Sequence, residues 1–400
     1  MVVTDAPILI AGGGIGGAAA ALTLARKGYA VRLLEQSREF GEIGAGIQLG
    51  PNVFKMFEQL GLTTAIEETA VRPDALVMRD ALDGEVVTRV PLNDDAFRAV
   101  FPYPYAVTYR PDLHNALLDA CKAEAHVELA TAAKVEDFEF AGDGVTVTLE
   151  DGGKLEGAAL IGADGLWSNV RAKLIGDGAP RVSGHIAYRA VLPAADMPPH
   201  LRWNEVVLWA GPRTHLVQYP LRRGEIFNLV AVFHSDRYEE GWDVFGDSEE
   251  LFERFAGEHP HVLELLGKIE SWRMWVLCDR EPIKDWSQGP VTLLGDAAHP
   301  MLQYLAQGAC MAIEDAVCLA HQLAAHDGNY TPAFQAYQSH RYLRTGRLQL
   351  TARFYGDVYH AEGVTRELRN MTLSPRTPEQ AYQGMAWLYN GVDEAGGQIL

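Results

Sequence analysis

Cysteine, long apolar runs and clustered positive charge are the features in which this chain is poorest. Its four cysteines show no Cys-x-x-Cys spacing, so neither a disulfide framework nor a metal site is expected, and a reducing cytoplasm is the simplest location. No uninterrupted apolar run approaches the roughly 18 residues of a transmembrane helix, and no basic leader with a cleavage site precedes the first apolar segment. These absences argue against a secreted, disulfide-stapled or membrane-spanning protein.

The charge is strongly one-sided. The 400 residues include 34 Lys and Arg against 53 Asp and Glu, which gives a formal net charge of −19. Such a chain repels phosphate backbones, so no nucleic-acid partner is expected. The metalloprotease spacing H-E-x-x-H and the nucleophile elbow G-x-S-x-G are also missing, which removes two common classes of hydrolase. With 48% hydrophobic and 22% charged residues the composition is globular, and the length favours two closely packed domains.

Glycine is concentrated near the N-terminus, where an apolar segment ends. Residues 7–11 are expected to form a buried strand, residues 16–27 a helix and residues 30–35 a second strand, a complete βαβ unit in about thirty residues. The turn between the first strand and the helix reads Gly12-Gly13-Gly14-Ile15-Gly16-Gly17. This context predicts a Rossmann-like, nucleotide-binding α/β domain, with a glycine turn that holds no ligand as the alternative.

Three of the glycines in this turn have separate physical tasks. Gly12 permits the tight turn, Gly14 lets the backbone approach a pyrophosphate, and Gly17 lets the helix pack closely on the strand. The helix N-terminus then offers free N–H groups and a positive dipole end to the phosphates. Glu35 closes the second strand, where a carboxylate can accept hydrogen bonds from ribose hydroxyls.

The rest of the chain divides by its periodicity. Helices are expected over residues 55–68, 113–124 and 308–326, and a meander of β-strands over residues 127–157. Between residues 183 and 275 alternating strands rich in Val, Tyr, Trp and Phe predict an antiparallel sheet in a second domain, which the strand-like residues 76–108 are expected to join. Residues 291–295 read as a buried parallel strand that returns to the first domain.

Two further glycine-bearing segments carry a family resemblance. One is Gly162-Ala163-Asp164-Gly165, and the other is Leu294-Gly295-Asp296-Ala297-Ala298-His299-Pro300. Together with the N-terminal turn, in this order and over almost the full chain, they resemble the motifs of the single-component flavoprotein aromatic hydroxylases. That resemblance implies the para-hydroxybenzoate hydroxylase fold: a Rossmann-like FAD-binding domain, a β-sheet substrate domain and C-terminal helices. The implied cofactor is tightly bound, non-covalent FAD.

The resemblance also assigns cofactor roles to particular residues. Gly12, Gly14 and Gly17 match the turn that holds the ADP half of FAD. Asp164 and Gly165 match a motif near both FAD and a passing nicotinamide nucleotide, and Gly295 and Asp296 match the motif for the ribityl chain, although an acid at position 296 could also cap a helix. Arg110, within Tyr109-Arg110-Pro111-Asp112-Leu113, and Gln48 match two further family motifs. Pro300 and Gly308 lie in the loop and at the helix start that should meet the flavin ring.

Only one dinucleotide fingerprint occurs in the sequence. A second nucleotide therefore has no Rossmann domain of its own, which favours NADH or NADPH as a transient visitor to an FAD enzyme; the family resemblance implies NADH. On this basis we expect three parts: an FAD-binding domain (residues 1–75, 106–182 and 279–345), a substrate-binding β-sheet domain (76–105 and 183–278) and a C-terminal helical region (346–400).

One strand of the second domain carries the expected substrate chemistry. Alternation over residues 214–221 places His215, Val217 and Tyr219 on one face. His215 could take or relay a phenolic proton, because the ordinary pKa of an imidazole lies near neutral pH. The residues alone are also compatible with a core histidine and a packing tyrosine. Within the family, this strand and the segment around Gln303 are most similar to the 3-hydroxybenzoate 6-hydroxylases, which implies catalytic roles for His215, Tyr219 and Gln303.

The implied reaction is a hydroxylation that uses NADH and O2 through a flavin C4a-hydroperoxide. For 3-hydroxybenzoate the product would be 2,5-dihydroxybenzoate (gentisate), made in a pocket roofed by Val217, Leu302 and Leu305 that excludes water. Salicylate or 6-hydroxynicotinate hydroxylation, a flavin dehydrogenase without oxygen transfer, and a non-catalytic flavin sensor are the alternatives. A homodimer is the family expectation. Arg189 could meet a carboxylate or the nicotinamide nucleotide, and His299 is expected to be structural.

Overall fold

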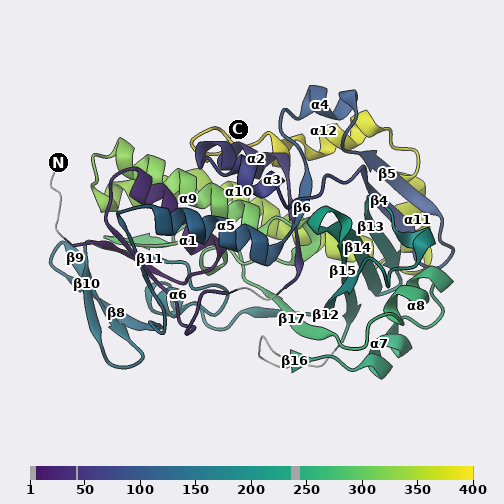
Figure 1. Cartoon of the computed structure of the whole chain (residues 1–400), viewed down its shortest axis with the longest axis horizontal. Helices are drawn as coiled ribbons and strands as arrows, with labels where there is room; N and C mark the ends of the chain where they lie inside the picture. Colours follow the sequence, from purple (N-terminus) through teal and green to yellow (C-terminus); the bar gives the residue numbers. More distant parts are fainter. Residues whose placement is uncertain (1–5, 42–43, 236–243, 400) are drawn as a thin grey trace.

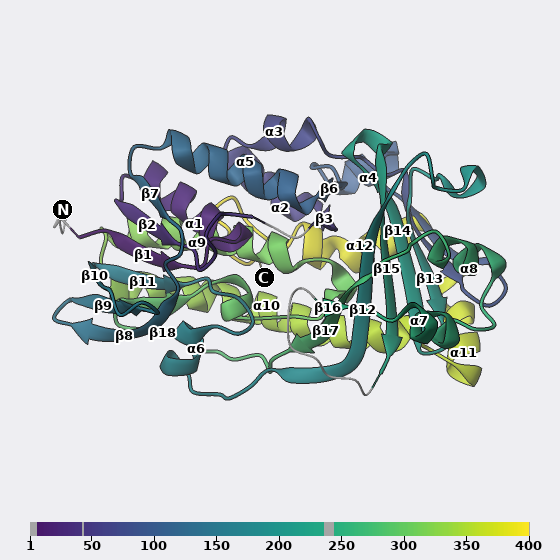
Figure 2. The same ribbon diagram turned by 60° about the horizontal axis from the view of Figure 1, so that its bottom comes forward.

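Two large β-sheets lie at opposite ends of the molecule, and long helices connect them (Figure 1). The computed structural model describes residues 6–41, 44–235 and 244–399. Helix α10 runs along the molecule from the first sheet towards the second (Figure 2). None of the helices described is both long and apolar enough to cross a lipid bilayer.

The first sheet has six strands and is parallel except at one edge. Its order is β18-β19-β11-β1-β2-β7, and only the β18–β19 pair is antiparallel. The central strands are fully buried, as parallel strands covered on both faces should be. In sheet order the strands are β18 (Ser287–Gln288), β19 (Val291–Leu293), β11 (Ala159–Gly162), β1 (Ile8–Ala11), β2 (Val31–Leu34) and β7 (Val127–Ala130).

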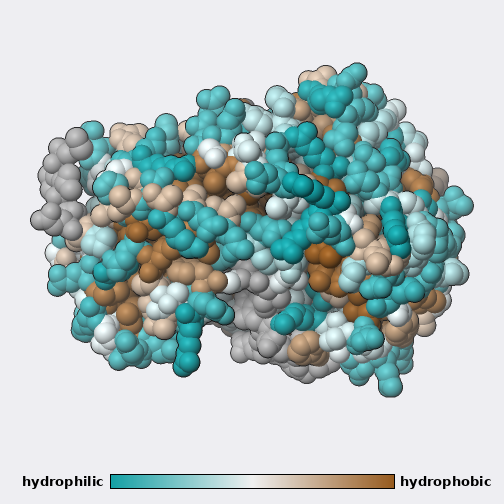
Figure 3. Space-filling model, in the orientation of Figure 1, coloured by the Kyte–Doolittle hydropathy of each residue, from teal (hydrophilic) through white to brown (hydrophobic). Residues whose placement is uncertain are grey.

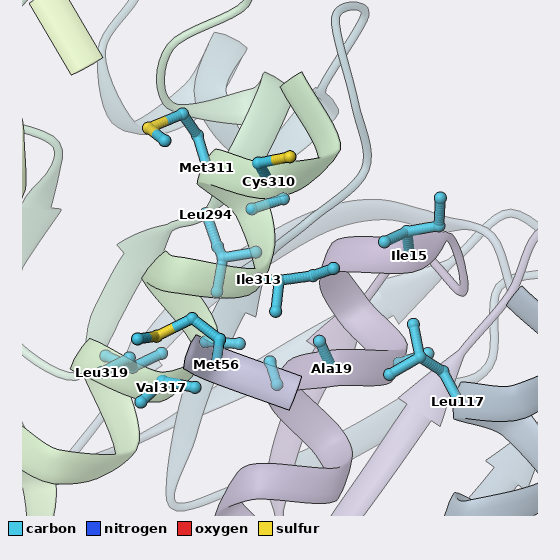
Figure 4. Packing of buried hydrophobic residues seen from close by; sticks show 14 of the residues in the cluster. Ile15, Ala19, Met56, Leu117, Leu294, Cys310, Met311, Ile313, Val317 and Leu319 are labelled. Atoms are coloured by element: carbon cyan, nitrogen blue, oxygen red, sulfur yellow. The ribbon is translucent and has the colours of Figure 1, made fainter. Parts of the chain in front are cut away.

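Three helices pack against one another on this sheet: α1 (Ile15–Arg26), α5 (Arg110–Ala123) and α9 (Gly308–Ala325). Alanines 18–21 of α1 are all buried, and their small side chains let α9 approach closely. The Thr23 hydroxyl of α1 donates to the Ala316 carbonyl of α9, at 3.1 Å. Figure 4 shows Ile15 and Ala19 of α1 facing Ile313 of α9, with Leu117 of α5 beside them.

The second sheet has eight strands in the order β16-β17-β12-β15-β14-β13-β4-β5, antiparallel except for the β13–β4 pair. Helices α7 (Ser248–Arg254) and α8 (Pro260–Leu266) cover one face, and the other face looks towards the end of α10 (Tyr330–Tyr359). The strands are β16 (Val244–Phe245), β17 (Arg273–Asp279), β12 (Arg181–Pro193), β15 (Ile226–His234), β14 (Thr214–Leu221), β13 (Val206–Gly211), β4 (Ala75–Asp80) and β5 (Val86–Pro91).

Smaller elements complete the chain. A two-stranded sheet and a three-stranded sheet lie between and beside the large ones, made of β3 (Gly46–Leu49), β6 (Ala106–Tyr109), β8 (Val135–Ala141), β9 (Gly144–Leu149) and β10 (Lys154–Gly157). The other helices are α2 (Pro51–Gln59), α3 (Thr63–Glu67), α4 (Asp95–Val100), α6 (Asn169–Leu174), α11 (Gly363–Leu373) and α12 (Pro378–Tyr389). Short 3-10 turns are η1 (Pro199–Leu201), η2 (Arg222–Gly224), η3 (Gly295–Ala297) and η4 (Gln303–Leu305).

Several sequence expectations need correction. The single helix expected over residues 55–68 is two helices, because Gly61 takes a positive φ of 58° after α2. Helix α5 begins at Arg110 rather than at residue 113, since Pro111 suits a first helical turn. Strand β7 joins the parallel sheet beside β2 rather than the meander.

The segment 76–108 joins the second sheet only in part. Strands β4 and β5 belong to it, but residues 95–100 form α4, which the Asp94 side chain caps by accepting from the Phe97 N–H at 2.7 Å. Strand β6 pairs with β3 instead. The three-part domain division stays a proposal. Strand β12 runs across its expected border at residue 182, and helix α10 runs across its expected border at residue 345.

Candidate active site

The glycine turn between β1 and α1 is as tight as its sequence suggests. Gly12 has a φ of 102°, and a Cβ atom there would lie 2.3 Å from the Ala163 carbonyl oxygen. A Cβ on Gly17 would lie 1.9 Å from the Gly12 carbonyl oxygen. Gly14 is the N-cap of α1 and offers no capping side chain, so the first N–H groups of the helix are left for a ligand.

Two polar side chains hold this turn in place. Glu35 accepts the Gly13 N–H through Oε2 and the Ser37 N–H through Oε1, each at 2.8 Å, so its carboxylate lies beside the glycines as expected for a ribose acceptor. Buried His114 of α5 bonds through Nε2 to the Gly13 carbonyl at 2.7 Å. Sequence reasoning missed His114, which has no motif of its own and is identified only by the packing of α5 on α1.

The parallel sheet brings the three motifs to one edge. Strands β1, β11 and β19 are neighbours, and each ends in a motif: the glycine turn, Asp164-Gly165 and Gly295-Asp296. Because the carboxyl ends of parallel strands share one edge of a sheet, segments more than a hundred residues apart in the chain meet there. This adjacency is the geometric basis for a single extended ligand.

At the second motif, Asp164 is half-buried and lies beside the start of α6, whose N-cap is Ser168. Its carboxylate accepts from the Ser168 hydroxyl and from the Val170 N–H, and burial raises its pKa. Gly165 has a φ of 77°, and a Cβ built on it would meet no atom within 4 Å, so this turn faces open space. The motif therefore presents backbone, rather than a bulky side chain, to whatever binds.

At the third motif, Gly295 takes a φ of 61° and donates its N–H to Asp315 of α9 at 3.0 Å. Asp296 is exposed, and a Cβ on Gly308 would lie 3.8 Å from its Oδ1, so the acid sits beside the start of α9. The Pro300 carbonyl accepts from Gln349 of α10 at 3.0 Å. The segment from Gly295 to Pro300 is thus anchored at both ends.

A buried ionic network supports this loop, and sequence reasoning missed most of it. Asp315 accepts from His299 at 2.6 Å and pairs with Arg341 at 2.6 Å, and both partners hold its pKa below the usual range. His299 is structural, as expected. Arg171 donates to the Ala297 and Ala298 carbonyls at 2.8 and 2.7 Å. The available signal was an acidic pair, Glu314 and Asp315, within the otherwise apolar α9.

These residues fit FAD. A Cβ atom at Gly12 or Gly17 would fill the turn, the uncapped start of α1 suits a pyrophosphate, and the Glu35 carboxylate lies beside the turn, where it can accept hydrogen bonds from ribose hydroxyls. Arg110 begins α5 and donates its backbone N–H to Ala45 at 2.9 Å, which places it next to β3.

Gln48 lies between the expected cofactor site and a group of buried tyrosines. Its side-chain oxygen accepts from the Tyr105 hydroxyl, and its amide hydrogen-bonds Tyr219. A Cβ on Gly46 would lie 2.6 Å from the Tyr219 hydroxyl, so only glycine lets that ring pass. Tyr105 was not identified from the sequence, and its hydroxyl adds a polar group beside Gln48.

One face of the second sheet carries the side chains expected to contact the substrate, and we call it the pocket floor. Strand register places His215, Val232 and Ala187 side by side, then Val217, Val230 and Arg189, and then Tyr219, Asn228 and Val191. The alternate residues, such as Leu216, pack into the core under α7 and α8. The predicted two-residue alternation of β14 is therefore confirmed by the register.

His215 stands at one end of this floor and is only 2% exposed. Burial lowers its pKa to about 3, so the ring is neutral, and its Nδ1 lies 2.7 Å from Nε2 of His360. Its ring centroid is 5.6 Å from that of Tyr304. A neutral imidazole is the form whose lone pair can accept a proton.

The predicted residue Gln303 precedes Tyr304 in η4, and its side-chain oxygen accepts from Arg189. The structure therefore places Gln303 beside Arg189 and Tyr219 beside Gln48. His215 lies two residues before Val217, on the same face of β14. Burial raises the pKa of Tyr219, so its phenol stays protonated.

An apolar cluster lies over this face of the sheet. Leu302 and Leu305, two of the residues expected in the roof, belong to it together with Tyr304, Ala352 and Tyr359. Val217 was expected in the roof but lies on the floor, because it shares one face of β14 with His215 and Tyr219. Such a lining keeps water from the reacting atoms.

Comparison with known proteins agrees with this geometry. The family described as FAD binding domain matches residues 5–345. A 3-hydroxybenzoate 6-hydroxylase of Polaromonas naphthalenivorans (strain CJ2) is 49% identical over 386 residues, 96% of each chain. A 6-hydroxynicotinate 3-monooxygenase of Pseudomonas fluorescens is 34% identical over 353 residues, 86% of this chain and 89% of its own.

Among solved structures, Klebsiella pneumoniae HpxO in complex with FAD and uric acid is similar throughout. The TM-score is 0.84 at 25% identity, with 98% of this chain and 97% of that chain covered. The chain belongs to the FAD binding domain family, and it is an FAD-dependent aromatic monooxygenase of the para-hydroxybenzoate hydroxylase fold.

Proposed function

We propose that this enzyme uses NADH and O2 to hydroxylate 3-hydroxybenzoate to 2,5-dihydroxybenzoate. The observation that carries the proposal is the pocket floor, where His215, Arg189 and Tyr219 lie on one face of three adjacent strands beneath an apolar roof. A small ring with a hydroxyl group and a carboxylate matches that set of side chains. The similarity to 3-hydroxybenzoate 6-hydroxylases supports the same substrate.

FAD would be held by the three motifs. Gly12, Gly14 and Gly17 with Glu35 take its ADP half. The other contacts come from Gln48, Arg110, Asp164, Gly165, Gly295, Asp296, Pro300 and Gly308. When bound, FAD accepts electrons from NADH and activates O2 for transfer to the ring. The N-terminal N–H groups of α9 point their positive dipole end at the loop that should meet the flavin ring.

His215 accepts the phenolic proton of the substrate. Loss of that proton raises electron density at the ring carbons ortho and para to the oxygen, and para attack on 3-hydroxybenzoate gives the 2,5-dihydroxy product. Gln303 orients the substrate through its bond to Arg189, and Tyr219, kept protonated by burial, donates a hydrogen bond. The apolar roof protects the activated oxygen from water.

Arg189 is our candidate for the carboxylate anchor. It is a half-buried cation whose Nε is buried without a partner, and within the described ranges no carboxylate pairs with it. Burial lowers its pKa to about 10, which still leaves it charged at neutral pH. A desolvated guanidinium gains most from a bidentate anion, and the ring acid supplies one.

Product identification from 3-hydroxybenzoate tests the proposal. The parent enzyme should form 2,5-dihydroxybenzoate with labelled oxygen from O2, and His215→Ala should lose hydroxylation at least a hundredfold while FAD stays bound. Arg189→Gln should raise KM at least tenfold and lose the preference over uncharged 3-hydroxybenzyl alcohol. Unchanged turnover in His215→Ala would remove that residue from the mechanism.

The same assay separates the alternatives. A salicylate or 6-hydroxynicotinate hydroxylase would share the cofactor residues and stimulate NADH oxidation with a different ring acid. The 34% identity to a 6-hydroxynicotinate 3-monooxygenase makes that acid the first one to compare. A flavin dehydrogenase would form product without labelled oxygen. Rapid flavin reduction by NADH in the presence of the ring acid would exclude a non-catalytic sensor.

We also propose a homodimer located in the cytoplasm. The C-terminal helices carry exposed apolar residues at helical spacing, which is unusual for a surface that faces only water. A cytoplasmic location rests on four cysteines that are all free and buried.

A further inference from the structure

Four histidines meet at one end of the pocket floor although they are scattered in the sequence. His185 and His234 are cross-strand partners in β12 and β15, and His215 lies on the neighbouring strand β14. His360 is the C-cap of α10, the helix whose end lies over this face of the sheet. No His-x-His or similar spacing announces this cluster, which only the tertiary structure assembles.

Three of the four, His185, His234 and His360, have ring nitrogens within 4.8 Å of one another. His360 Nδ1 and His234 Nε2 lie 3.0 Å apart. Bonds of 2.0–2.1 Å to a tetrahedral zinc ion place two nitrogens about 3.4 Å apart, so small side-chain rotations would complete the site. The ring centroids of His185 and His234 are 4.3 Å apart, as adjacent ligands on neighbouring strands can be.

The remaining ring nitrogens of two of these histidines already have hydrogen-bond partners. His185 Nδ1 bonds to the Tyr304 hydroxyl, and His360 Nε2 lies 2.7 Å from His215 Nδ1. In metal centres the nitrogen that does not bind the ion is almost always fixed in this way, which sets the tautomer and the orientation of the ring. Tyr304 and His215 would fill these supporting positions.

The charge state and access also suit a metal ion. Zinc binds the neutral form of imidazole, and the three rings lie close enough together to share one ion. His185 and His234 are partly exposed and open a route from solvent. Asp357 and Glu362 attract cations towards His234, whereas Arg213 opposes them.

We propose that His185, His234 and His360 form a binding site for a divalent transition metal such as Zn2+, and that its occupation switches off His215. Three neutral imidazoles select zinc, nickel or copper over magnesium and calcium, which prefer oxygen ligands. The site departs from the sequence expectation of no metal. Its inhibitory effect rests on the proposed role of His215 as the acceptor of the phenolic proton.

The inhibition follows from the proton positions. A metal ion on His360 Nδ1 requires the proton of that ring to be on Nε2, from which it donates to His215 Nδ1. His215 must then accept at Nδ1 and carry its own proton on Nε2. Both of its nitrogens are occupied, so it has no lone pair left to take the phenolic proton.

Zinc titration of the FAD-loaded enzyme tests the site. Isothermal titration calorimetry with zinc chloride should show one ion bound per chain, and His185→Gln and His234→Gln should each weaken binding at least tenfold. Hydroxylation of 3-hydroxybenzoate should fall at least tenfold at saturating zinc, recover with EDTA, and become insensitive to zinc in both variants. His261→Gln, in a separate histidine group with His200 and His259, should respond like the parent.

Two outcomes would overturn the proposal. Absence of calorimetric binding, or binding that persists in the His185→Gln and His234→Gln variants, would remove the site. Zinc that binds there without slowing hydroxylation would remove the switch. Since calorimetry needs no substrate, a failure to hydroxylate 3-hydroxybenzoate would count against the proposed function and leave the metal site intact.

Discussion

Buried charged side chains in this protein serve two different ends. Arg341 is fully buried and is paired with Glu314 and Asp315, at 2.8 and 2.6 Å, and this group holds the loop after Gly295 in place. Arg189 has no such carboxylate among the described residues. Breaking the first kind of pair costs about 3–5 kcal/mol because a charge is stranded, whereas in our proposal Arg189 gains its anion only when substrate binds. The first kind stabilises the fold, and the second is suited to recognition.

Glu258 gives a pH-dependent prediction at the residue scale. Burial raises its pKa to about 8 from 4.5, and its one partnered oxygen accepts from the Thr214 hydroxyl. The folded state therefore keeps a proton that the unfolded state releases. The contribution of Glu258 to the free energy of unfolding is fully present below pH 4.5. It falls by about 1.4 kcal/mol per pH unit as the pH rises towards 8. Glu258→Gln should abolish this loss.

Urea unfolding at pH 5 and pH 8 checks the effect. The parent should lose more free energy of unfolding between these values than Glu258→Gln does. Glu253→Gln, which changes an exposed carboxylate on α7, should follow the parent. An identical loss in Glu258→Gln and the parent would show that Glu258 is ionised in the folded protein.

At the scale of elements, the first βαβ unit depends on how closely α1 approaches the turn before it. Gly17 contacts the Gly12 carbonyl, and the buried alanines that follow keep α1 close to α9. Glycine is required here by distance rather than by φ, since only Gly12 has a positive φ in this turn. The geometry of the proposed pyrophosphate site therefore depends on a few small side chains.

Gly17→Ala should lose most of its bound FAD. The new Cβ would lie 1.9 Å from the Gly12 carbonyl oxygen, so the turn must open and the N–H groups of α1 move away from the phosphates. Flavin absorbance after gel filtration measures the effect, and we expect at least a tenfold weaker affinity. Gly384→Ala in α12, where a Cβ meets nothing within 4 Å, is the matched control and should keep its flavin. Equal flavin content in both variants would refute this account.

At the scale of the whole molecule, the surface is mixed in character. Figure 3 shows one face on which hydrophilic residues dominate and hydrophobic residues gather in separate patches. Helix α10 exposes three large apolar residues at spacings of seven and four, and α11 exposes three at spacings of four and three, which are Leu343, Leu350, Phe354, Val364, Leu368 and Met371. These spacings put each set on one face of its helix.

The proposed homodimer predicts that charge on this face separates the subunits. Phe354 is 61% exposed, and Phe354→Glu combined with Leu350→Lys should convert the parent dimer into a monomer that still binds FAD. Sedimentation velocity gives the oligomeric state directly. Val182→Glu changes an exposed apolar residue on β12 and should stay dimeric. A monomeric parent, or a dimer that survives the double substitution, would exclude this face.

Local pattern and spacing predicted much of the nucleotide-binding half. The glycine turn, the strand–helix–strand order and the two later glycine–acid motifs each depend on backbone requirements that only certain residues meet, so they can be found without coordinates. The alternation of β14 likewise identified the face that carries His215 and Tyr219. These features are local, because each depends on neighbours within a few residues along the chain.

Only the tertiary structure decided which distant residues meet. His114 reaches the glycine turn, Arg171 holds the carbonyls of the third motif, and His360 joins three histidines of the second sheet through packing between separate elements. Sheet order and helix packing set such contacts over separations of a hundred residues or more, and no periodicity in the sequence records them. The sequence by itself determined the cofactor-binding architecture, because its motifs are local, whereas three-dimensional packing decided the surroundings of His215 and the position of Arg189 on the same face of the sheet.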